Sequence, residues 1–357
     1  MSPAYIIAEA GVNHNGSLAM AKKLVDAAAR AGVDAVKFQA FNADRLVTKN
    51  APKASYQIKA DRQSRTQWEM IRRLELNEAS HRVLFSQCRR RKIGFISTPF
   101  DKGCLSFLIR VGVNIIKISS SEITNGPFLV QAARTNLPII LSTGMSTLKE
   151  VEESMGALAF GYLRKKGNPT RRILTNLFRN DLSREVLKNK VILLHCTTEY
   201  PAPFIDVNLM AMDTLARHFG VKVGLSDHSE GIAVAIAAVA RGAAVVEKHF
   251  TLDRNLPGPD HRASLEPKEL AVLVRSIREV EQAIGSGKKT PARSEIKNRA
   301  IVRKSIVAAA FIKRGDRFSE KNLAAKRPGS GLSPMHYWDL LGKASIKDYQ
   351  IDERVTQ

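Results

Sequence analysis

Two histidines, His228 and His249, each follow a short apolar run, GLSD in the first case and VVEK in the second. The stretch between them, EGIAVAIAAVARG, has helical periodicity, so the two runs are interpreted as neighbouring parallel strands. Neutral imidazole is a common ligand of divalent transition metals, and two imidazoles at adjacent strand ends can share one ion. We therefore predict a metal site at His228 and His249. The alternative, a structural role, is the usual interpretation of a single histidine.

Carboxylates stand close to this pair in the sequence. Asp227 and Glu247 flank the histidines, and the loop PGPDH adds Asp260. These three are candidates for groups that support the metal ligands or touch a substrate.

Lysines inside two further apolar runs indicate an anionic ligand. Lys37 lies in DAVKFQ and Lys117 in NIIKISSSE, and an unpaired ammonium is costly to bury. Hydroxyl side chains near the ends of these and neighbouring runs are Thr98, Ser120, Ser142 and Ser226. A cationic, hydroxyl-rich ring suits a phosphate or a carboxylate. A Schiff base is the other role open to either lysine, but a metal that already polarises a carbonyl argues against it.

Two further carboxylates, Glu9 in YIIAEAGVN and Glu122 in KISSSE, belong to the same set of run ends. They are the candidate general acid and base, and an ion pair with one of the two lysines is the structural alternative. Cys196 follows His195 in VILLHCTTEY. Because side chains alternate along a strand, these two point opposite ways, and we expect Cys196 to serve as core packing.

The elements that must carry these residues are eight short apolar runs separated by amphipathic segments. The first six runs are YIIAEAGVN, DAVKFQ, GFISTPF, NIIKISSSE, PIILSTGM and VILLHCTTEY, and the last two are those that end at the paired histidines. Near-continuous apolar strands that alternate with helices indicate an α/β fold with a parallel sheet buried on both faces. Eight such units predict a (β/α)₈ (TIM) barrel, whose active site lies at the C-terminal ends of the strands.

The predicted domains are a barrel over 1–285, a polar linker over 286–298 and a small β-rich module over 299–357. A long segment after the second run is expected to fold over the barrel mouth. A second long segment, 164–190, carries nine Lys or Arg and two Asp or Glu, and we interpret it as a basic surface insertion.

Composition restricts the class of protein. The 357 residues carry a formal charge of +22, which fits a solvated basic surface, steering of anionic substrates or nucleic-acid binding. Aromatic residues make up 6%, without a basic–aromatic repeat, so nucleic acid is the weakest of these. Three cysteines without CxxC spacing, no signal-peptide pattern and no apolar run near the roughly 20 residues of a membrane span predict a cytoplasmic protein without membrane partners.

Together these stretches resemble the N-acetylneuraminate (sialic acid) synthase family from about Ile6 to Lys343. The motifs that carry the resemblance are AEAGVNHNGS, DAVKFQAF, APKASYQIK, FISTPFD, KISSSE, LSTGMS, LLHCTTEYPAPF, GLSDHS, EKHFTLD, GPDH, RKSIVA and KRPGSG. The resemblance implies that phosphoenolpyruvate condenses with N-acetylmannosamine, as the open-chain aldehyde, and water to give N-acetylneuraminate and phosphate. It also implies a C-terminal antifreeze-like (SAF) domain that closes the partner's site in a domain-swapped homodimer.

The resemblance further implies roles for single residues. His228 and His249 match ligands of a divalent metal, usually Mn²⁺, with Mg²⁺ or Co²⁺ as other candidates. The residues that match the phosphoenolpyruvate pocket are Lys37, Thr98, Lys117, Ser120, Ser142, Thr198 and Ser226. Thr198 stands where some members have Asn. The residues that match contacts to the acceptor sugar are Gln39, Tyr200, Asp260 and Arg327, the last from the other subunit. Glu9 and Glu122 match carboxylates near the reacting carbons.

Three alternatives remain open. A legionaminate-type synthase, which uses a diacetamido-trideoxyhexose as acceptor, shares most of these motifs, although APKASYQIK and KRPGSGLSP favour N-acetylmannosamine. A metal-dependent pyruvate aldolase would need neither the full phosphate ring nor the C-terminal module. A nucleic-acid-binding protein has only the net charge in its favour.

Overall fold

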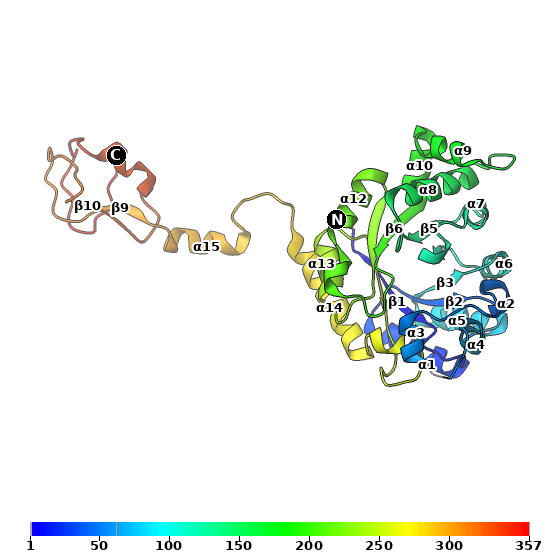
Figure 1. The fold of residues 1–357 in the computed structure, drawn as a ribbon. Coiled ribbons are helices and arrows are strands. Elements are labelled where there is room, and N and C mark those ends of the chain that lie inside the picture. The colour runs from blue at the N-terminus through cyan, green and yellow to red at the C-terminus, as the bar shows by residue number, and fades with distance from the viewer. Residues whose placement is uncertain (1, 62, 357) are drawn as a thin grey trace. The chain divides into compact units, whose positions relative to one another are not determined.

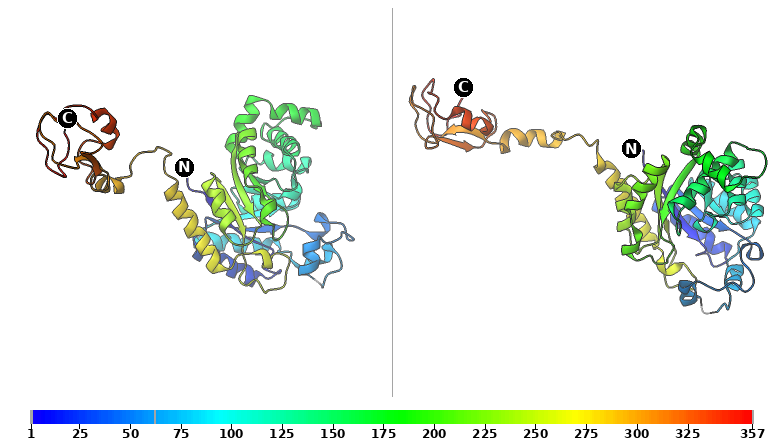
Figure 2. Two further views of the ribbon diagram at one scale, coloured as in Figure 1. Left: turned by 60° about the vertical axis from the view of Figure 1, so that its left-hand side comes forward. Right: turned by 45° about the horizontal axis from the view of Figure 1, so that its top comes forward.

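The chain forms two compact units, Met1–Gly285 and Ser286–Gln357 (Figure 1, Figure 2). The computed structural model describes residues 2–61 and 63–356. Within these ranges, no helix combines the length and the apolar composition that crossing a membrane requires.

The first unit is a barrel of eight parallel strands. The strands are β1 (Tyr5–Gly11), β2 (Ala35–Ala40), β3 (Gly94–Pro99), β4 (Ile116–Ile118), β5 (Ile139–Ser142), β6 (Val191–Cys196), β7 (Lys222–Asp227) and β8 (Val245–His249). Their order in the sheet is β3-β2-β1-β8-β7-β6-β5-β4, and β3 also contacts β4, which closes the barrel. The predicted (β/α)₈ barrel is therefore confirmed.

Helices surround the strands (Figure 1). The longer ones are α1 (Leu18–Ala31), α5 (Glu78–Arg91), α6 (Lys102–Val111), α7 (Gly126–Arg134), α8 (Leu148–Tyr162), α12 (Met210–Phe219), α13 (Ala233–Ala240) and α14 (Pro267–Ile284). Local sequence sets their ends. Ser17 accepts from the Met20 N–H at the start of α1, and Gly32 ends that helix at a φ of 81°, where glycine is favoured.

The barrel interior alternates along each strand between apolar and polar layers. One interior layer consists of Ile7, Ala35, Ile96, Ile140, Leu194 and Val245, all buried. Because side chains repeat every two residues, the next inward layer toward the C-terminal ends begins two positions later on each strand. That layer holds the polar residues of the site.

Two excursions extend the barrel. Between β2 and β3 lie α2 (Ala43–Leu46), α3 (Ser55–Ala60) and α4 (Gln67–Arg73). An apolar cluster of Val12, Phe41, Met70 and Leu74, with Leu46 packed against it, joins α2 and α4. After α8, the basic segment forms α9 (Arg171–Phe178) and α10 (Asp181–Lys190). Its apolar side chains Phe178 and Leu187 are buried, so this segment is amphipathic and packs on the barrel with its charges outward.

The second unit is small and β-rich, which confirms the predicted class of the C-terminal module. It contains α15 (Arg293–Val302), an antiparallel pair of β9 (Ser305–Ala308) and β10 (Leu323–Lys326), and α16 (Tyr337–Leu340). Its core includes Ile306, Phe318 and Tyr349. Helix α15 begins within the stretch for which the sequence predicted only a polar linker.

Close packing of α9 on α8 gives a first prediction. A Cβ on Gly156 of α8 would lie against the Leu174 carbonyl of α9, well inside van der Waals distance. Gly156→Ala should therefore push the helices apart and lower the free energy of unfolding by about 1–3 kcal/mol, measured by urea unfolding. Gly126→Ala, where a Cβ meets nothing within 4 Å, is the matched control. Equal stability of both variants would contradict this packing argument.

Candidate active site

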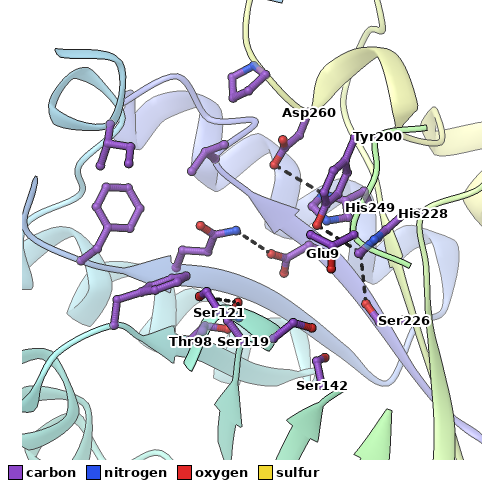
Figure 3. Close-up of a pocket in the computed structure, with 18 of the residues that line it drawn as sticks. Glu9, Thr98, Ser119, Ser121, Ser142, Tyr200, Ser226, His228, His249 and Asp260 are labelled. Carbon is purple, nitrogen blue, oxygen red and sulfur yellow. Dashed lines mark hydrogen bonds and ion pairs between the residues drawn. The ribbon is translucent and has the colours of Figure 1, made fainter. Parts of the chain in front are cut away.

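A cavity of ≈ 490 Å³ opens at the C-terminal ends of the barrel strands (Figure 3). Its floor is the polar interior layer. The members of that layer are Glu9, Lys37, Thr98, Lys117, Ser142, Cys196, Ser226 and Glu247, and all of them line the cavity. The strand register sets several of them directly side by side, namely Glu9 beside Lys37, Cys196 beside Ser226 and Ser226 beside Glu247. The strand-end residues predicted from sequence are thus brought together.

Lys37 is fully enclosed by partners. Its Nζ lies 2.8 Å from Glu9 Oε2 and 3.7 Å from Glu247 Oε2, and it donates to Thr98 Oγ1 at 3.3 Å. Glu9 also accepts from the Gln39 amide at 3.1 Å. Glu9 thus forms the ion pair that was the structural alternative, and its carboxylate also lines the cavity.

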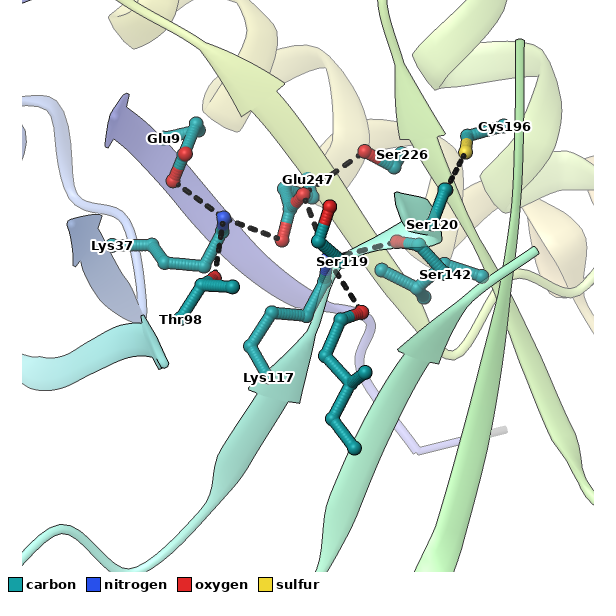
Figure 4. A network of polar contacts seen from close by, with 12 residues as sticks. Glu9, Lys37, Thr98, Lys117, Ser119, Ser120, Ser142, Cys196, Ser226 and Glu247 are labelled. Atoms are coloured by element: carbon teal, nitrogen blue, oxygen red, sulfur yellow. Dashed lines mark hydrogen bonds and ion pairs between the residues drawn. The ribbon is translucent and has the colours of Figure 1, made fainter. Parts of the chain in front are cut away.

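Glu247 lies between the two lysines (Figure 4). Its Oε1 lies 3.5 Å from Lys117 Nζ and accepts from Ser226 Oγ at 2.9 Å. Lys117 in turn donates to Ser142 Oγ at 2.8 Å. The sequence predicted Glu247 as a support of the metal ligands or a substrate contact, and the structure adds that it is the counter-ion of both lysines. Its position two residues after Val245, which lies in the interior layer, points its side chain into the barrel.

These four buried charges shift one another's pKa values. Burial would raise the pKa of Glu247, but the ammonium groups of Lys117 and Lys37 outweigh it and lower that pKa. Burial lowers the pKa of Lys117. Burial raises the pKa of Glu9, with the charge of Glu247 adding to the effect. Glu9 is therefore the carboxyl of the floor best suited to take up and release a proton.

The two histidines lie side by side, with ring centroids 5.4 Å apart. The Thr197 carbonyl accepts from His228 Nδ1 at 2.7 Å, which leaves the Nε2 lone pair toward the cavity. Burial lowers the pKa of His228 to about 4 and that of His249 well below its ordinary value, so both rings are neutral.

The histidine pair fits a divalent metal in its donor chemistry. Among the described residues, His249 Nδ1 is buried without a hydrogen-bond partner, and it lies 3.7 Å from Asp260 Oδ2. No group of three or more His, Cys, Asp or Glu within 2–61 and 63–356 is arranged to hold an ion. A metal on this pair would therefore take further ligands from substrate or water.

Tyr200 and Asp260 line the wall above the histidines. The Tyr200 ring stacks on His228 at 4.2 Å between centroids, and its hydroxyl lies 3.3 Å from His228 Nε2. Burial raises the pKa of Asp260 to about 7. Together with Gln39, these residues line the cavity as the sequence predicted for acceptor contacts.

Ser120 and Glu122 belong to a 3₁₀ turn, η1 (Ser120–Glu122), and both line the cavity. Glu122 accepts from the Asn125 amide at 2.7 Å, so an amide and not an ammonium holds its carboxylate. Thr198 also lines the cavity, and its buried Oγ1 has no hydrogen-bond partner among the described residues.

Cys196 corrects one expectation. Its Sγ lies 3.1 Å from Ser120 Oγ, and the side chain faces the cavity instead of serving as core packing. His195 points the other way, toward the Val207 carbonyl at 2.6 Å. The two side chains do alternate as predicted, but Cys196 faces the cavity and His195 faces away from it, the reverse of the prediction. Leu194, two positions before Cys196, lies in the inner apolar layer and fixes the inward parity.

Arg327, the remaining predicted contact, lies in the second unit. It follows β10, and its side chain is exposed.

Comparisons with known proteins show which family the chain resembles over most of its length. The model of the NeuB family matches residues 24–289, and that of the SAF domain matches 303–356. An N,N'-diacetyllegionaminic acid synthase of Campylobacter jejuni is 47% identical over all of both chains. One of Legionella pneumophila is 46% identical over 95% of this chain and 89% of its own. The crystal structure of an N-acetylneuraminic acid (sialic acid) synthetase of Leptospira borgpetersenii, in complex with citrate, has a TM-score of 0.68 and 35% identity, and the match covers 83% of this chain and 90% of that chain.

The central position of Glu247 leads to a second prediction. Glu247→Gln leaves two buried ammonium groups short of a counter-charge, which should cost about 3–5 kcal/mol of unfolding free energy in urea unfolding. Inorganic phosphate should restore much of this loss, because an oxyanion can take the place of the carboxylate.

Asp227→Asn is the matched control for this rescue. It breaks another buried ion pair, between Asp227 Oδ2 and Lys248 Nζ at 2.8 Å, and neither residue lines the cavity. Phosphate also stabilises proteins in general, so equal stabilisation of both variants would contradict an anion site at the lysines.

Proposed function

Because the chain belongs to the NeuB family, we propose that it condenses phosphoenolpyruvate with the open-chain aldehyde of an N-acylated hexosamine and water, giving a nonulosonic acid and phosphate. The observation that carries this proposal is the buried ring of two lysines and several hydroxyls beside a pair of neutral histidines. A trianionic substrate needs such a ring, and an aldehyde acceptor needs an electrophile-activating group next to it.

The acceptor that we favour is a diacetamido-trideoxyhexose, which would make the product a legionaminic acid. Sequence motifs favoured N-acetylmannosamine instead. The relatives with 47% and 46% identity are both N,N'-diacetyllegionaminic acid synthases, and they support the diacetamido-trideoxyhexose better than N-acetylmannosamine. N-acetylmannosamine remains the comparison acceptor in every assay.

The barrel floor supplies the phosphoenolpyruvate site in this proposal. Lys37 and Lys117 pair with the phosphate and the carboxylate, while Thr98, Ser142 and Ser226 donate hydrogen bonds to their oxygens. Ser120 and Thr198 complete the ring from its η1 and β6 sides. Fixed donors of this kind cost little reorganisation when charge moves from the enol ester to the departing phosphate.

The reaction then needs few further groups. The enol carbon forms a bond to the aldehyde carbon, and water adds to the oxocarbenium carbon that results. The bond between that carbon and the phosphate oxygen then breaks, and the carbon becomes the keto group of the product. One proton of the water ends on the hydroxyl formed from the aldehyde oxygen, and the other leaves with phosphate. Glu9 accepts and returns a proton in these steps, because its pKa is raised and its carboxylate lines the cavity. Glu122 is the second candidate for proton transfer.

His228 and His249 would hold a divalent metal, most favourably Mn²⁺, with Mg²⁺ or Co²⁺ as substitutes. When bound, the metal supplies a Lewis acid for the acceptor carbonyl. Tyr200, Gln39 and Asp260 orient the acceptor from the adjacent wall.

Metal dependence is the direct test. Chelation should abolish phosphate release from phosphoenolpyruvate with either acceptor, and Mn²⁺ should restore it. His228→Gln should lower kcat/KM by at least about a hundredfold. His195→Gln is the control, because His195 also lies near the end of a strand but its side chain points out of the barrel toward the Val207 carbonyl. This variant should keep full metal-dependent activity.

Mass spectrometry of the product gives the companion readout. A nonulosonic acid formed together with phosphate supports a synthase. Condensation of pyruvate without phosphate release would instead establish the aldolase alternative, and full activity of His228→Gln would remove the histidine pair from the metal site.

We also propose that the protein acts as a homodimer in which Arg327 of one subunit completes the site of the other. Mixing Arg327→Ala subunits with His228→Gln subunits should then restore about one quarter of wild-type activity, since half the dimers are mixed and one site in each is intact. Phosphate release after subunit exchange measures this recovery. Activity that stays at the level of the separate variants would contradict a crossed arrangement.

A further inference from the structure

The cavity has two sides of different chemistry. The floor carries the charges described above. Another part of the lining comes from the segment between β2 and β3, residues 41–74, here called the β2–β3 segment. Its described side chains that line the cavity are all uncharged. The apolar ones are Phe41, Leu46, Val47, Met70, Ile71 and Leu74.

Three polar side chains of the same segment also reach the cavity. Tyr56, Gln57 and Gln67 line it, and they are joined to one another. Gln57 Oε1 accepts from the Ala54 N–H at 2.9 Å and from Gln67 Nε2 at 3.4 Å, and Gln57 Nε2 donates to Tyr56 OH at 3.4 Å. Such a chain of amides beside apolar side chains suits a neutral ligand that has both amide and methyl groups.

Aromatic contacts connect this side to the histidine pair. The Tyr56 ring lies 5.1 Å from the Tyr200 ring, which itself stacks on His228. An acceptor whose aldehyde lies at the histidines therefore extends past Tyr200 toward the β2–β3 segment.

The two candidate acceptors differ in the groups that this side would meet. A diacetamido-trideoxyhexose has one more acetamido group than N-acetylmannosamine, and one of its carbons carries neither oxygen nor nitrogen. N-acetylmannosamine presents hydroxyls at those places. A hydroxyl loses hydrogen bonds to water when it faces apolar side chains, whereas a methyl group gains by leaving water.

We infer that the β2–β3 segment determines acceptor specificity, its apolar side chains and amides receiving the second acetamido group and the deoxygenated carbon. This inference rests on the proposed function. It assigns the choice of acceptor to residues that contact neither the lysines nor the histidines.

Leu46→Gln and Ile71→Gln test the inference, because both side chains are only half-buried and tolerate a polar replacement. The measurement is kcat/KM for the diacetamido-trideoxyhexose and for N-acetylmannosamine, together with KM for phosphoenolpyruvate. We expect wild type to prefer the diacetamido sugar. Each variant should lower the ratio of the two kcat/KM values at least about tenfold, with KM for phosphoenolpyruvate unchanged.

Ile58→Gln is the matched control. Ile58 belongs to α3 in the same segment, is 55% exposed and does not line the cavity, so its replacement should leave the ratio unchanged. An unchanged ratio in both cavity variants, an equal loss with both acceptors, or a wild-type preference for N-acetylmannosamine would each overturn the inference. Release of no phosphate by wild type with any acceptor would instead overturn the proposed function, and this inference with it.

Discussion

Burial of two ammonium groups is the constraint on which the site depends. Lys37 and Lys117 lie inside the barrel, where burial of an unpaired cation costs several kcal/mol of folding free energy, so Glu9 and Glu247 must accompany them. Four charges from four strands meet only if the strands close into a barrel with the observed register. The charged layer therefore rests on the apolar layer beneath it, which fixes strand spacing and excludes water from below.

The same burial acts in the opposite sense on the histidines. Burial, the neighbouring His228 and the nearby lysines lower the pKa of His249, and burial lowers that of His228, so both rings stay neutral. One enclosed environment thus stabilises charge where carboxylates compensate it and prevents charge where they do not. In the proposed function, the anion and the metal would therefore bind beside each other without competing for the same groups.

Much of this arrangement follows from the sequence, because alternation and strand ends are local properties. The eight strands, the polar residues at their ends, the lysines and the histidine pair all come from runs of at most ten residues. The orientation of Cys196 was predicted wrongly and the counter-ion role of Glu247 was not predicted, because the inward-facing positions of a strand depend on which of its apolar residues packs inside the barrel. Val245 and Leu194 decide these positions, and only the packed barrel identifies them as interior.

The β2–β3 segment shows where sequence reasoning stops. Its helices are short, and its apolar residues carry no periodicity that tells a cavity wall from a core cluster. Phe41, Met70 and Leu74 serve as both. The charged floor and the β2–β3 segment would select substrates in two different ways. On our proposal the floor, built from the barrel strands, selects by charge, whereas the β2–β3 segment, a connection between strands, selects by shape and polarity. A connection can change without disturbing the ion-pair network, because loops tolerate substitution better than the strands that they join. On this proposal, relatives that keep the charged floor can differ in the acceptor sugar that the β2–β3 segment admits.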